Sequence, residues 1–397
     1  MKKVLSFVLA ALMLVGLMTA CGEKADENVI KVGVFEPATG ENGAGGQQEV
    51  IGIRYANSKF PTITLNGKEY KIQLVEVDNQ SDKAAAVTAA QTLVSNGVIG
   101  VLGSYGSGVS IAAGNTFKEA KIPAIGCSCT NPQVTSGNEY YSRVCFLDPF
   151  QGTVMASYAN KTCSYKKAAV ISQNGDDYST GLASYFKQAF VDFGGEVAYE
   201  GTYNTNETDF NAILTAAKAA DPEVIFVPSS IVTAGLFIKQ ARELGITCAI
   251  MAGDTWENAT IIENAGKDNC NGVTFSTFFD EKSNKEFVDG FKAYLNSDKE
   301  AFRLNGNNDI VAAVSALGYD SYLALYEGLK GLEGKEINGE NLKDALKTIN
   351  VQGVTGVLAF DENGDSLKDT AFIKEMKDGE FKFLGIQKTD GAFTPAE

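Results

Sequence analysis

The stretch VIKVGVF at residues 29–35, followed by TGENGAGG at residues 39–46, begins the repeating pattern that decides the fold of this 397-residue chain. The first stretch is rich in valine and isoleucine, which predicts a buried strand, and the glycines after it predict a loop. Residues 47–58 carry apolar side chains at helical spacing and predict a helix. Together these segments predict the strand, loop and helix of one unit of a parallel sheet.

Outward from this unit, the same order recurs along the chain and restarts after residue 147. Further strands are predicted at residues 72–77, 98–102, 122–125, 168–172, 196–203, 224–227 and 248–252. Two α/β units of similar size are therefore expected. Helices predicted at 287–295, 311–328 and 342–348 are too few to form a compact domain, so we expect them to return to the first unit. A terminal hairpin is predicted at residues 371–388.

The first 28 residues predict export and anchoring. Two lysines precede an uncharged apolar run, residues 4–20, which ends at Cys21. A basic start, an apolar core and a small residue before a cleavage point are typical of a signal peptide, here residues 1–20. The ending resembles the lipobox of bacterial lipoproteins, which implies that Cys21 is acylated, although Met18 stands where that pattern prefers leucine. Two or more acyl chains would hold the protein at a membrane, with residues 21–28 as a tether.

Composition excludes several classes of function. The chain has 34 Lys and Arg against 49 Asp and Glu, a net charge of −15, and no basic block, which argues against nucleic acid as a partner. It has no histidine, which removes Ser-His-Asp and Cys-His nucleophiles and histidine zinc sites. The cysteines after Cys21 are too sparse for a disulfide scaffold, and Cys127-Ser128-Cys129 lacks the usual spacing of metal ligands. We therefore expect structural thiols and a protein that is not an enzyme and uses no cofactor or metal.

The Gly-rich loop at residues 40–46 does not match a nucleotide-binding motif. Gln48 stands where the third glycine of the dinucleotide fingerprint belongs, and no Gly-Lys-Ser/Thr follows for a phosphate loop. We expect instead a flexible rim where the backbone comes close to a ligand.

Two loops that follow neighbouring predicted strands offer groups that suit a carboxylate. The segment GSYGSG at 103–108 follows one strand and precedes a helix, so open N–H groups and the Ser104 hydroxyl can bind an anion. An ordinary helix N-cap is the alternative. The loop at 127–132 also follows a strand end, so the two loops are expected to converge at one edge of the sheet.

The second unit offers an acid and aromatic side chains. Asp254 follows the strand predicted at 248–252, and Tyr178 lies in the loop after the strand at 168–172. An acid at this position can pair with a ligand ammonium, while Tyr178 or Trp256 would supply an apolar wall. The alternative for each of these residues is an ordinary place in a solvent-facing loop.

Short motifs, weak one by one, recur in a specific order from residue 29 to about residue 390. They are Lys31-Val32-Gly33-Val34, Val101-Leu102-Gly103-Ser104, Thr130-Asn131-Pro132, Tyr178 with Gly181, Asp209-Phe210, Gln240-Ala241-Arg242 with Gly245, and FDENGD at 360–365. In this order the chain resembles the branched-chain amino-acid binding proteins of ABC transporters, which have the periplasmic binding protein type I fold. The resemblance implies two Rossmann-like α/β lobes with parallel sheets, joined by a hinge of three crossovers near residues 148, 278 and 370. Lobe 1 would contain residues 29–147 and 278–369, and lobe 2 residues 148–277 and 370–397.

The resemblance also implies how a ligand is held. Ser104 and the backbone of Cys129 and Thr130 would hold an α-carboxylate and part of the ammonium. Asp254 would pair with the ammonium, and Tyr178 would contact the ligand from lobe 2. The expected ligand-binding set is completed by Tyr105, Ser128 and Ser230. Two positions depart from the family pattern, since Gly45 stands where the family often has an aromatic residue and Ser230 lies near the position of a second-lobe tyrosine.

These expectations together describe a monomeric, extracytoplasmic receptor, lipid-anchored to the membrane through Cys21. It would capture an amino acid, branched-chain or otherwise aliphatic, by hinge closure and deliver it to an ABC transporter permease. The alternative on the same fold is a receptor for amides, urea-like solutes or aromatic acids. A surface enzyme would need paired carboxylates or a cofactor motif, and a signalling sensor would need a further transmembrane and output segment; we expect neither.

Overall fold

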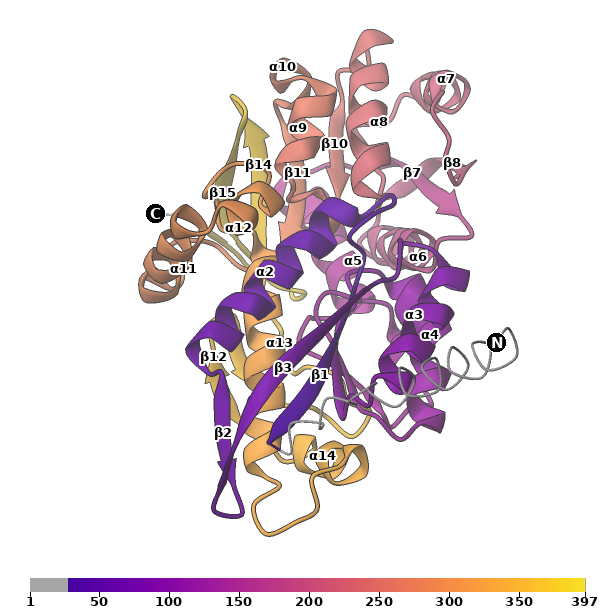
Figure 1. Ribbon diagram of the computed structural model, residues 1–397. Helices are drawn as coiled ribbons and strands as arrows, with labels where there is room; N and C mark the ends of the chain where they lie inside the picture. The colour runs from indigo at the N-terminus through magenta and orange to yellow at the C-terminus, as the bar shows by residue number, and fades with distance from the viewer. Residues whose placement is uncertain (1–27, 397) are drawn as a thin grey trace, which may run out of the picture.

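The computed structural model describes residues 28–396, which form two α/β lobes, each built on one main sheet (Figure 1). The strand order is β2-β3-β1-β4-β5-β6 in the first sheet and β16-β15-β14-β11-β10-β9-β7-β8 in the second. The prediction of two Rossmann-like lobes with parallel sheets is confirmed, and antiparallel strands extend the edges of both sheets.

The first sheet is parallel except for β2, which pairs antiparallel at one edge. The strands that follow β3 in the chain are short. Its strands are β1 (Val29–Glu36), β2 (Thr62–Leu65), β3 (Lys68–Asp78), β4 (Gly100–Leu102), β5 (Ala124–Gly126) and β6 (Tyr141–Arg143). The helices that precede β6 in the chain are α2 (Gly43–Lys59), α3 (Lys83–Ser95), α4 (Ser107–Glu119) and the 3₁₀ turn η1 (Pro132–Val134). Strand β1 is buried along most of its length, as its valine and isoleucine content predicts.

Late helices join the first lobe, where they pack on the sheet, on α2 or on one another (Figure 1). They are α11 (Lys285–Ser297), α12 (Lys299–Leu304), α13 (Ala313–Lys330) and α14 (Gly339–Leu346), followed by the small hairpin of β12 (Val351–Gly353) and β13 (Gly356–Leu358). Helices α2 and α13 touch backbone to backbone, because a Cβ on Gly52 would lie 2.0 Å from the Ser315 carbonyl oxygen and one on Gly318 2.3 Å from that of Glu49. Glycine therefore permits the contact that fixes α2 in this lobe.

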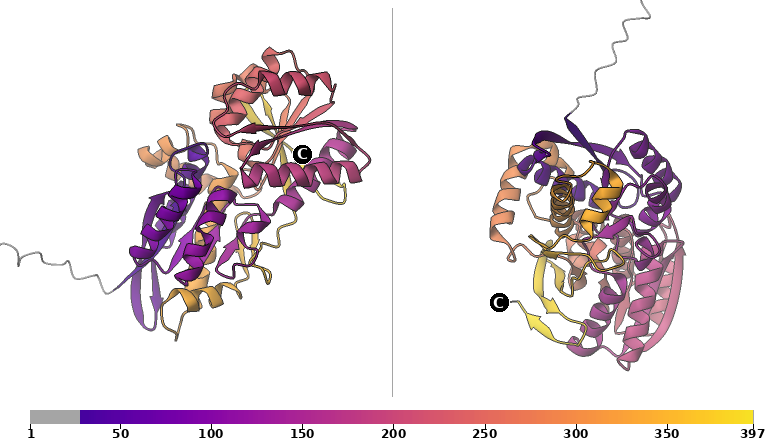
Figure 2. Two further views of the ribbon diagram at one scale, coloured as in Figure 1. Left: turned by 90° about the vertical axis from the view of Figure 1, so that its right-hand side faces the viewer. Right: turned by 90° about the horizontal axis from the view of Figure 1, so that it is seen from below.

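The second lobe begins with α5 (Asp148–Ser157), which packs on α6, and its sheet takes in the last strands of the chain (Figure 2). Its strands are β7 (Lys167–Asn174), β8 (Glu196–Asn204), β9 (Val224–Phe226), β10 (Ala249–Ala252), β11 (Val273–Thr277), β14 (Ala371–Lys377), β15 (Glu380–Gln387) and β16 (Phe393–Pro395). Its other helical segments are η2 (Tyr158–Thr162), α6 (Asp177–Asp192), α7 (Asn211–Ala219), α8 (Ile231–Glu243), η3 (Asp254–Trp256), α9 (Ala259–Ala265) and α10 (Lys267–Cys270).

The chain passes between the lobes three times, as the resemblance implies. It leaves the first sheet after β6, returns to the first lobe after β11, and enters the second sheet again at β14, which pairs antiparallel with β11. In Figure 2 the yellow strands of the chain's end accordingly lie with the second lobe, where β14, β15 and β16 form one edge of its sheet, and the orange helices lie beside the indigo ones.

Local predictions differ from the structure at several points. The hairpin of β2 and β3 was not predicted, although Asn66 and Gly67, both with positive φ, form the kind of two-residue turn that joins such strands. Strand β6 and helix α5 were also not predicted. Helix α3 is capped by Asp82, whose carboxylate accepts from the N–H groups of Ala84 and Ala85.

No helix within residues 28–396 is long and apolar enough to cross a membrane. The predicted signal peptide, the acylated Cys21 and nearly all of the tether lie outside the described residues. The six cysteines from Cys127 to Cys270 are all free, four of them buried. This agrees with their interpretation as structural thiols.

Candidate functional site

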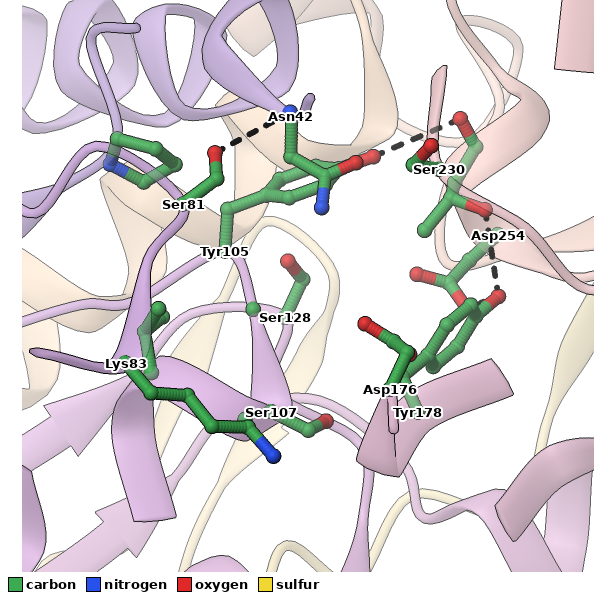
Figure 3. Close-up of a pocket in the computed structure, with 15 residues that line it drawn as sticks. Asn42, Ser81, Lys83, Tyr105, Ser107, Ser128, Asp176, Tyr178, Ser230 and Asp254 are labelled. Atoms are coloured by element: carbon green, nitrogen blue, oxygen red, sulfur yellow. Dashed lines mark hydrogen bonds between the residues drawn. The ribbon is translucent and has the colours of Figure 1, made fainter. Parts of the chain in front are cut away.

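A pocket lies between the lobes and is lined by residues that directly follow strands of both sheets (Figure 3). Its empty volume is about 640 Å³, part of it open to solvent. From lobe 1, Pro37, Tyr105 and Ser128 follow β1, β4 and β5; from lobe 2, Asp176 and Asp254 follow β7 and β10. The carboxyl ends of parallel strands are where α/β proteins bind ligands. The remaining lining residues are Asn42, Ser81, Lys83, Gly106, Ser107, Gly108, Val109, Tyr178, Ser230 and Thr255.

The lobe 1 side of the pocket is the N-terminus of α4. Gly106 is the N-cap, and Ser107, Gly108 and Val109 form the first turn, whose N–H groups have no partner within the helix. The Ser107 hydroxyl accepts a hydrogen bond from the Asn131 N–H at 3.1 Å, which leaves its own proton free to be donated. Unpaired N–H groups and a hydroxyl at the positive end of a helix form a site for an anion.

The lobe 2 side carries an acid held for pairing with a cation. Asp254 is 2% exposed, and its Oδ1 accepts from Gln151 Nε2 at 2.8 Å and from the Tyr178 hydroxyl at 3.1 Å. Burial raises the pKa of Asp254 to about 6, although these donors oppose the rise. The carboxylate is therefore mainly ionised at neutral pH and lacks a cationic partner among the described residues.

Aromatic side chains close the pocket in a different way from the family pattern. The Tyr105 ring takes the space beside Gly45, because a Cβ on Gly45 would lie 2.3 Å from Tyr105 Cε2. Tyr105 reaches across to lobe 2, where its hydroxyl donates to the Thr255 carbonyl at 3.5 Å. Trp256, considered as a second wall, is fully buried and donates through Nε1 to Ser229 Oγ at 3.1 Å, so it belongs to the core of lobe 2.

Five of the residues that the sequence singled out line the pocket, namely Tyr105, Ser128, Tyr178, Ser230 and Asp254. Ser230 does so while it caps α8 through its hydroxyl. Three others lie behind the lining. Ser104 is fully buried and its hydroxyl accepts from Asn79 Nδ2 at 2.8 Å. Cys129 and Thr130 are also fully buried, and the Cys129 carbonyl accepts from Arg143 Nη1 at 2.7 Å.

Several lining residues were missed from the sequence. Ser107 lies three residues after Ser104 in the same small-residue loop, and only the start of α4 at Ser107 distinguishes the two. Lys83 and Asp176 lie at the N-termini of α3 and α6, where charged residues are common, so their type gave no functional signal. Asn42 lies in the Gly-rich segment that was expected to form the rim.

Hydrogen bonds between the lobes surround this pocket and show that the lobes are closed on each other. The Glu41 carboxylate of lobe 1 accepts from Gln173 Nε2 at 3.1 Å and from the Asn206 N–H at 3.3 Å, both in lobe 2. Lys83 Nζ lies 2.8 Å from Asp177 Oδ2 and donates to the Gly175 carbonyl at 3.1 Å. These contacts join the rim of lobe 1 to the carboxyl ends of β7 and β8 and to the start of α6.

Beneath the pocket, Glu36, Glu49 and Cys127 have ligand-type atoms within 4.8 Å of one another, the one such buried trio among the described residues. Burial raises the pKa of the Cys127 thiol well above its usual value, which keeps it protonated and a poor metal ligand. One oxygen of each glutamate already accepts a hydrogen bond, Glu36 from the Tyr105 N–H and Glu49 from the Ser128 hydroxyl.

Comparisons with known proteins agree with this geometry. A model of the family described as periplasmic binding protein matches residues 29–380. An amino acid binding protein of Pseudomonas aeruginosa is 31% identical over 346 residues, which are 85% of this chain and 87% of that protein. The solved structure of a leucine binding protein of Thermotoga maritima has a TM-score of 0.82 and 31% identity, covering 91% of this chain and 100% of that one. A branched-chain amino acid transporter substrate binding protein of Streptococcus pneumoniae, solved with isoleucine, has a TM-score of 0.79 and 27% identity, covering 92% and 100%.

Proposed function

The chain belongs to the periplasmic binding protein family, and on that premise we propose that it captures an amino acid with an aliphatic, branched side chain for an ABC transporter. Proteins of this family bind solutes and are not enzymes. The related proteins named for leucine and for branched-chain amino acids support this ligand class. One observation supports the proposal most strongly: one wall of the pocket offers hydrogen-bond donors for an anion, and the other offers a carboxylate for a cation.

An amino acid has a carboxylate and an ammonium on adjacent atoms, and the pocket offers a partner for each. The N-terminus of α4, with Ser107, would hold the carboxylate, and the Ser128 hydroxyl lies on the same wall. Asp254 would pair with the ammonium, with Tyr178 donating to the same carboxylate oxygen. Uncharged amides and urea-like solutes would leave Asp254 without a charge partner, which disfavours that alternative.

The ligand's side chain would be held by apolar surface at the rim of the pocket. Pro37, Val109 and the rings of Tyr105 and Tyr178 line it. Each methylene that moves from water into such a pocket contributes only about 0.8 kcal/mol, so we expect several aliphatic amino acids to bind within a narrow range of affinity.

The transport step follows from closure of the lobes. We propose that residues 29–147 with 278–369, and residues 148–277 with 370–397, move as two bodies about the three crossovers. A ligand that contacts both walls binds the closed state more tightly than the open state and so shifts the population toward it. The permease would recognise the closed form.

The remaining parts of the proposal concern location and partners. Acylation of Cys21 would anchor a monomeric receptor on the outer side of the cell membrane, with residues 21–28 as the tether. Its partner would be the membrane permease of an ABC importer. Release of the protein from membranes by a Cys21→Ser substitution would support the anchor.

A thermal-shift screen of residues 22–397 against the twenty amino acids, urea, short amides and aromatic acids tests the ligand class. A ligand present at 100 times its dissociation constant stabilises the folded state by about 2.7 kcal/mol, which is readily detected. We expect shifts confined to aliphatic amino acids. A response only to an amide or an aromatic acid would instead support the alternative receptor and remove the role assigned to Asp254.

The substitution Asp254→Asn tests the ammonium partner directly. It keeps the shape of the side chain but removes a buried charge, so we expect a loss of about 3–5 kcal/mol, or at least a hundredfold in Kd measured by calorimetry. Asp192→Asn, at an exposed position on α6 of the same lobe, is the matched control and should bind as the unmodified protein does. Equal affinities for the two variants would contradict the proposal.

A further inference from the structure

Two glutamates lie together directly beneath the lobe 1 side of the pocket, and amino-acid binding alone gives no reason for them. Glu36 is the last residue of β1 and Glu49 lies on α2; they are 2% and 0% exposed. A carboxylate oxygen of one lies within 4.8 Å of a carboxylate oxygen of the other. Two acids of like charge are thus held side by side away from water.

Each of these glutamates supports one residue of the pocket lining. The Tyr105 N–H donates to Glu36 Oε2 at 2.7 Å, and the Ser128 hydroxyl donates to Glu49 Oε1 at 2.5 Å. Gly103 makes room for this arrangement, because a Cβ at that position would lie 2.6 Å from Glu36 Oε1. The pair therefore links β1 and α2 to both loops that form the lobe 1 side of the pocket.

No cation of the described residues forms an ion pair with either glutamate. Among residues 28–396, neither glutamate forms an ion pair, and the other ionisable groups that act on them are acids, thiols or a phenol, namely Asp254, Cys127, Cys129 and Tyr105. Arg143, a buried cation of this lobe, is paired with Asp365 at 2.8 Å. Two ionised carboxylates in contact without water or a cation are strongly disfavoured, so at least one must carry a proton.

The second carboxylate oxygen of each glutamate is available to hold this proton. Glu36 Oε1 and Glu49 Oε2 are buried, and no N–H or O–H group of the described residues donates to either. A proton on one carboxyl group would provide a donor for the other, in a short, charge-assisted hydrogen bond. Burial raises the pKa of Glu49 to about 8, and burial together with the neighbouring Glu49 raises the pKa of Glu36 well above its usual value.

We propose that Glu36 and Glu49 share one proton, and that the proton-bridged pair positions Tyr105 and Ser128 for ligand binding. The ligand part of this inference rests on the proposed function, whereas the shared proton does not. Loss of the proton would place two repelling charges beneath the pocket. The pair would then separate, and the two loops that it supports would lose their alignment with α4.

A metal ion is the competing occupant of the same place. It would require the Cys127 thiol to ionise, yet that thiol is fully buried and faces the Ser321 hydroxyl at 3.3 Å. Ser128 and Tyr105 already occupy one oxygen of each glutamate. A stoichiometric divalent ion in the purified protein, removed by a chelator with loss of stability, would overturn the proton-sharing pair.

Urea unfolding without any ligand tests the shared proton. In the unfolded chain both glutamates ionise near their usual pKa, whereas in the folded chain the pKa of Glu49 is raised to about 8 and that of Glu36 is also raised well above its usual value, so the pair still holds a proton at pH 8 and stability falls as the pH rises between about 5 and 8. In Glu49→Gln the amide donates to Glu36 and accepts from Ser128 without titrating. We expect the folding equilibrium constant of the unmodified protein to fall, relative to that of Glu49→Gln, by up to about tenfold per pH unit in this window.

Ligand affinity tests the positioning role. Above about pH 8 the unmodified protein should lose affinity for the amino acid found in the screen, by up to about tenfold per pH unit, beyond any loss from the ligand's own ammonium. Glu49→Gln should retain near-normal affinity at pH 7 and show only the ligand's titration. Glu49→Ala, which leaves Ser128 without its acceptor, should bind more weakly than Glu49→Gln at every pH.

The controls separate this inference from the proposed function. Glu243→Gln, at an exposed position on α8, should follow the unmodified protein in both experiments. If Glu49→Gln does not fold, Glu36→Gln leaves the same single acid and provides the same comparison. Parallel stability profiles for unmodified and substituted proteins would overturn the shared proton. Divergent stability profiles with parallel affinity profiles would support the proton and overturn its positioning role.

Discussion

The two walls of the pocket present opposite chemistry to the same space. Lobe 1 presents donors, which are Ser107, the first-turn N–H groups of α4 and, at the rim, Lys83, whereas lobe 2 presents the carboxylates of Asp254 and Asp176 (Figure 3). A ligand with only one charged end satisfies one wall and leaves the other unpaired. This difference is the reason why we propose a zwitterion, which can pair with both walls at once, as the ligand.

The buried acids of the two lobes also differ in the hydrogen-bond donors that surround them. Asp254 receives two side-chain donors, from Gln151 and Tyr178, which favour its charged form against the cost of burial. Glu36 and Glu49 each accept one hydrogen bond from an N–H or O–H group of the described residues, and they lie against one another. An acid that binds a ligand must be ionised, while an acid that supports a loop serves equally well when protonated. The number of donors around each carboxyl group distinguishes the two roles.

Acidification should neutralise the acid on the lobe 2 wall and cause the largest loss of ligand affinity. Burial raises the pKa of free Asp254 to about 6, and a bound ammonium lowers it, so affinity is full above about pH 6 and is lost as the pH falls below it. We expect the affinity for the amino acid to fall about tenfold per pH unit, or about a hundredfold at pH 4. Calorimetry between pH 4 and 7 measures this.

A second lobe 2 acid provides the control for that experiment. Asp176 also lines the pocket, but one of its oxygens caps α6 by accepting from the Ser179 N–H at 2.6 Å. Asp176→Asn should keep the acid dependence, because Asp254 remains. Disappearance of the dependence in Asp176→Asn would move the ammonium site from Asp254 to Asp176.

Much of the fold could be predicted from the sequence because it depends on local patterns. Buried runs such as residues 29–35 and the helices between them specify both parallel sheets, and Asp254 and Tyr178 were found because each follows a strand. The hairpin at Asn66-Gly67 carried a recognisable turn signal that the prediction did not use. Strand β6 has only three residues and no apolar run of its own, so no local pattern marks it.

The rest of the site depends on where the chain lies in three dimensions. Ser104 and Ser107 are the same residue type in one small-residue loop. Which of them lines the pocket depends on the residue at which α4 begins. Glu36 and Glu49 are of a residue type expected at the surface, and only the packing of α2 over β1 buries them together. Glu41 contacts Gln173 and Asn206 of the other lobe, a pairing that no sequence spacing indicates.

The substitution Ser107→Ala should weaken the lobe 1 wall by an intermediate amount. It removes one hydroxyl donor to the ligand carboxylate and leaves the N–H groups of α4 in place, so we expect a loss of about 1.5–3 kcal/mol. That is a tenfold to hundredfold rise in Kd at pH 7, measured by calorimetry. Ser95→Ala, an exposed serine in the last turn of α3, should leave Kd unchanged. If Ser104→Ala lowers affinity and Ser107→Ala does not, the carboxylate lies where the sequence first placed it.

The contact that joins the two walls at the rim should have the smallest effect. Lys83 and Asp177 form an ion pair across the lobes at 2.8 Å, with side chains 51% and 31% exposed. Exposed pairs contribute about 0–1 kcal/mol, so Lys83→Met should raise Kd by no more than about fivefold, through faster release. Because the pair is screened by salt, the difference from the unmodified protein should shrink at high ionic strength.

The control is Lys187→Met. It removes the ion pair between Lys187 and Glu200, which is of similar exposure but lies within lobe 2, and should change stability without changing release. Stopped-flow release rates that are equal for Lys83→Met and Lys187→Met would show that closure depends on the ligand alone and not on this rim contact.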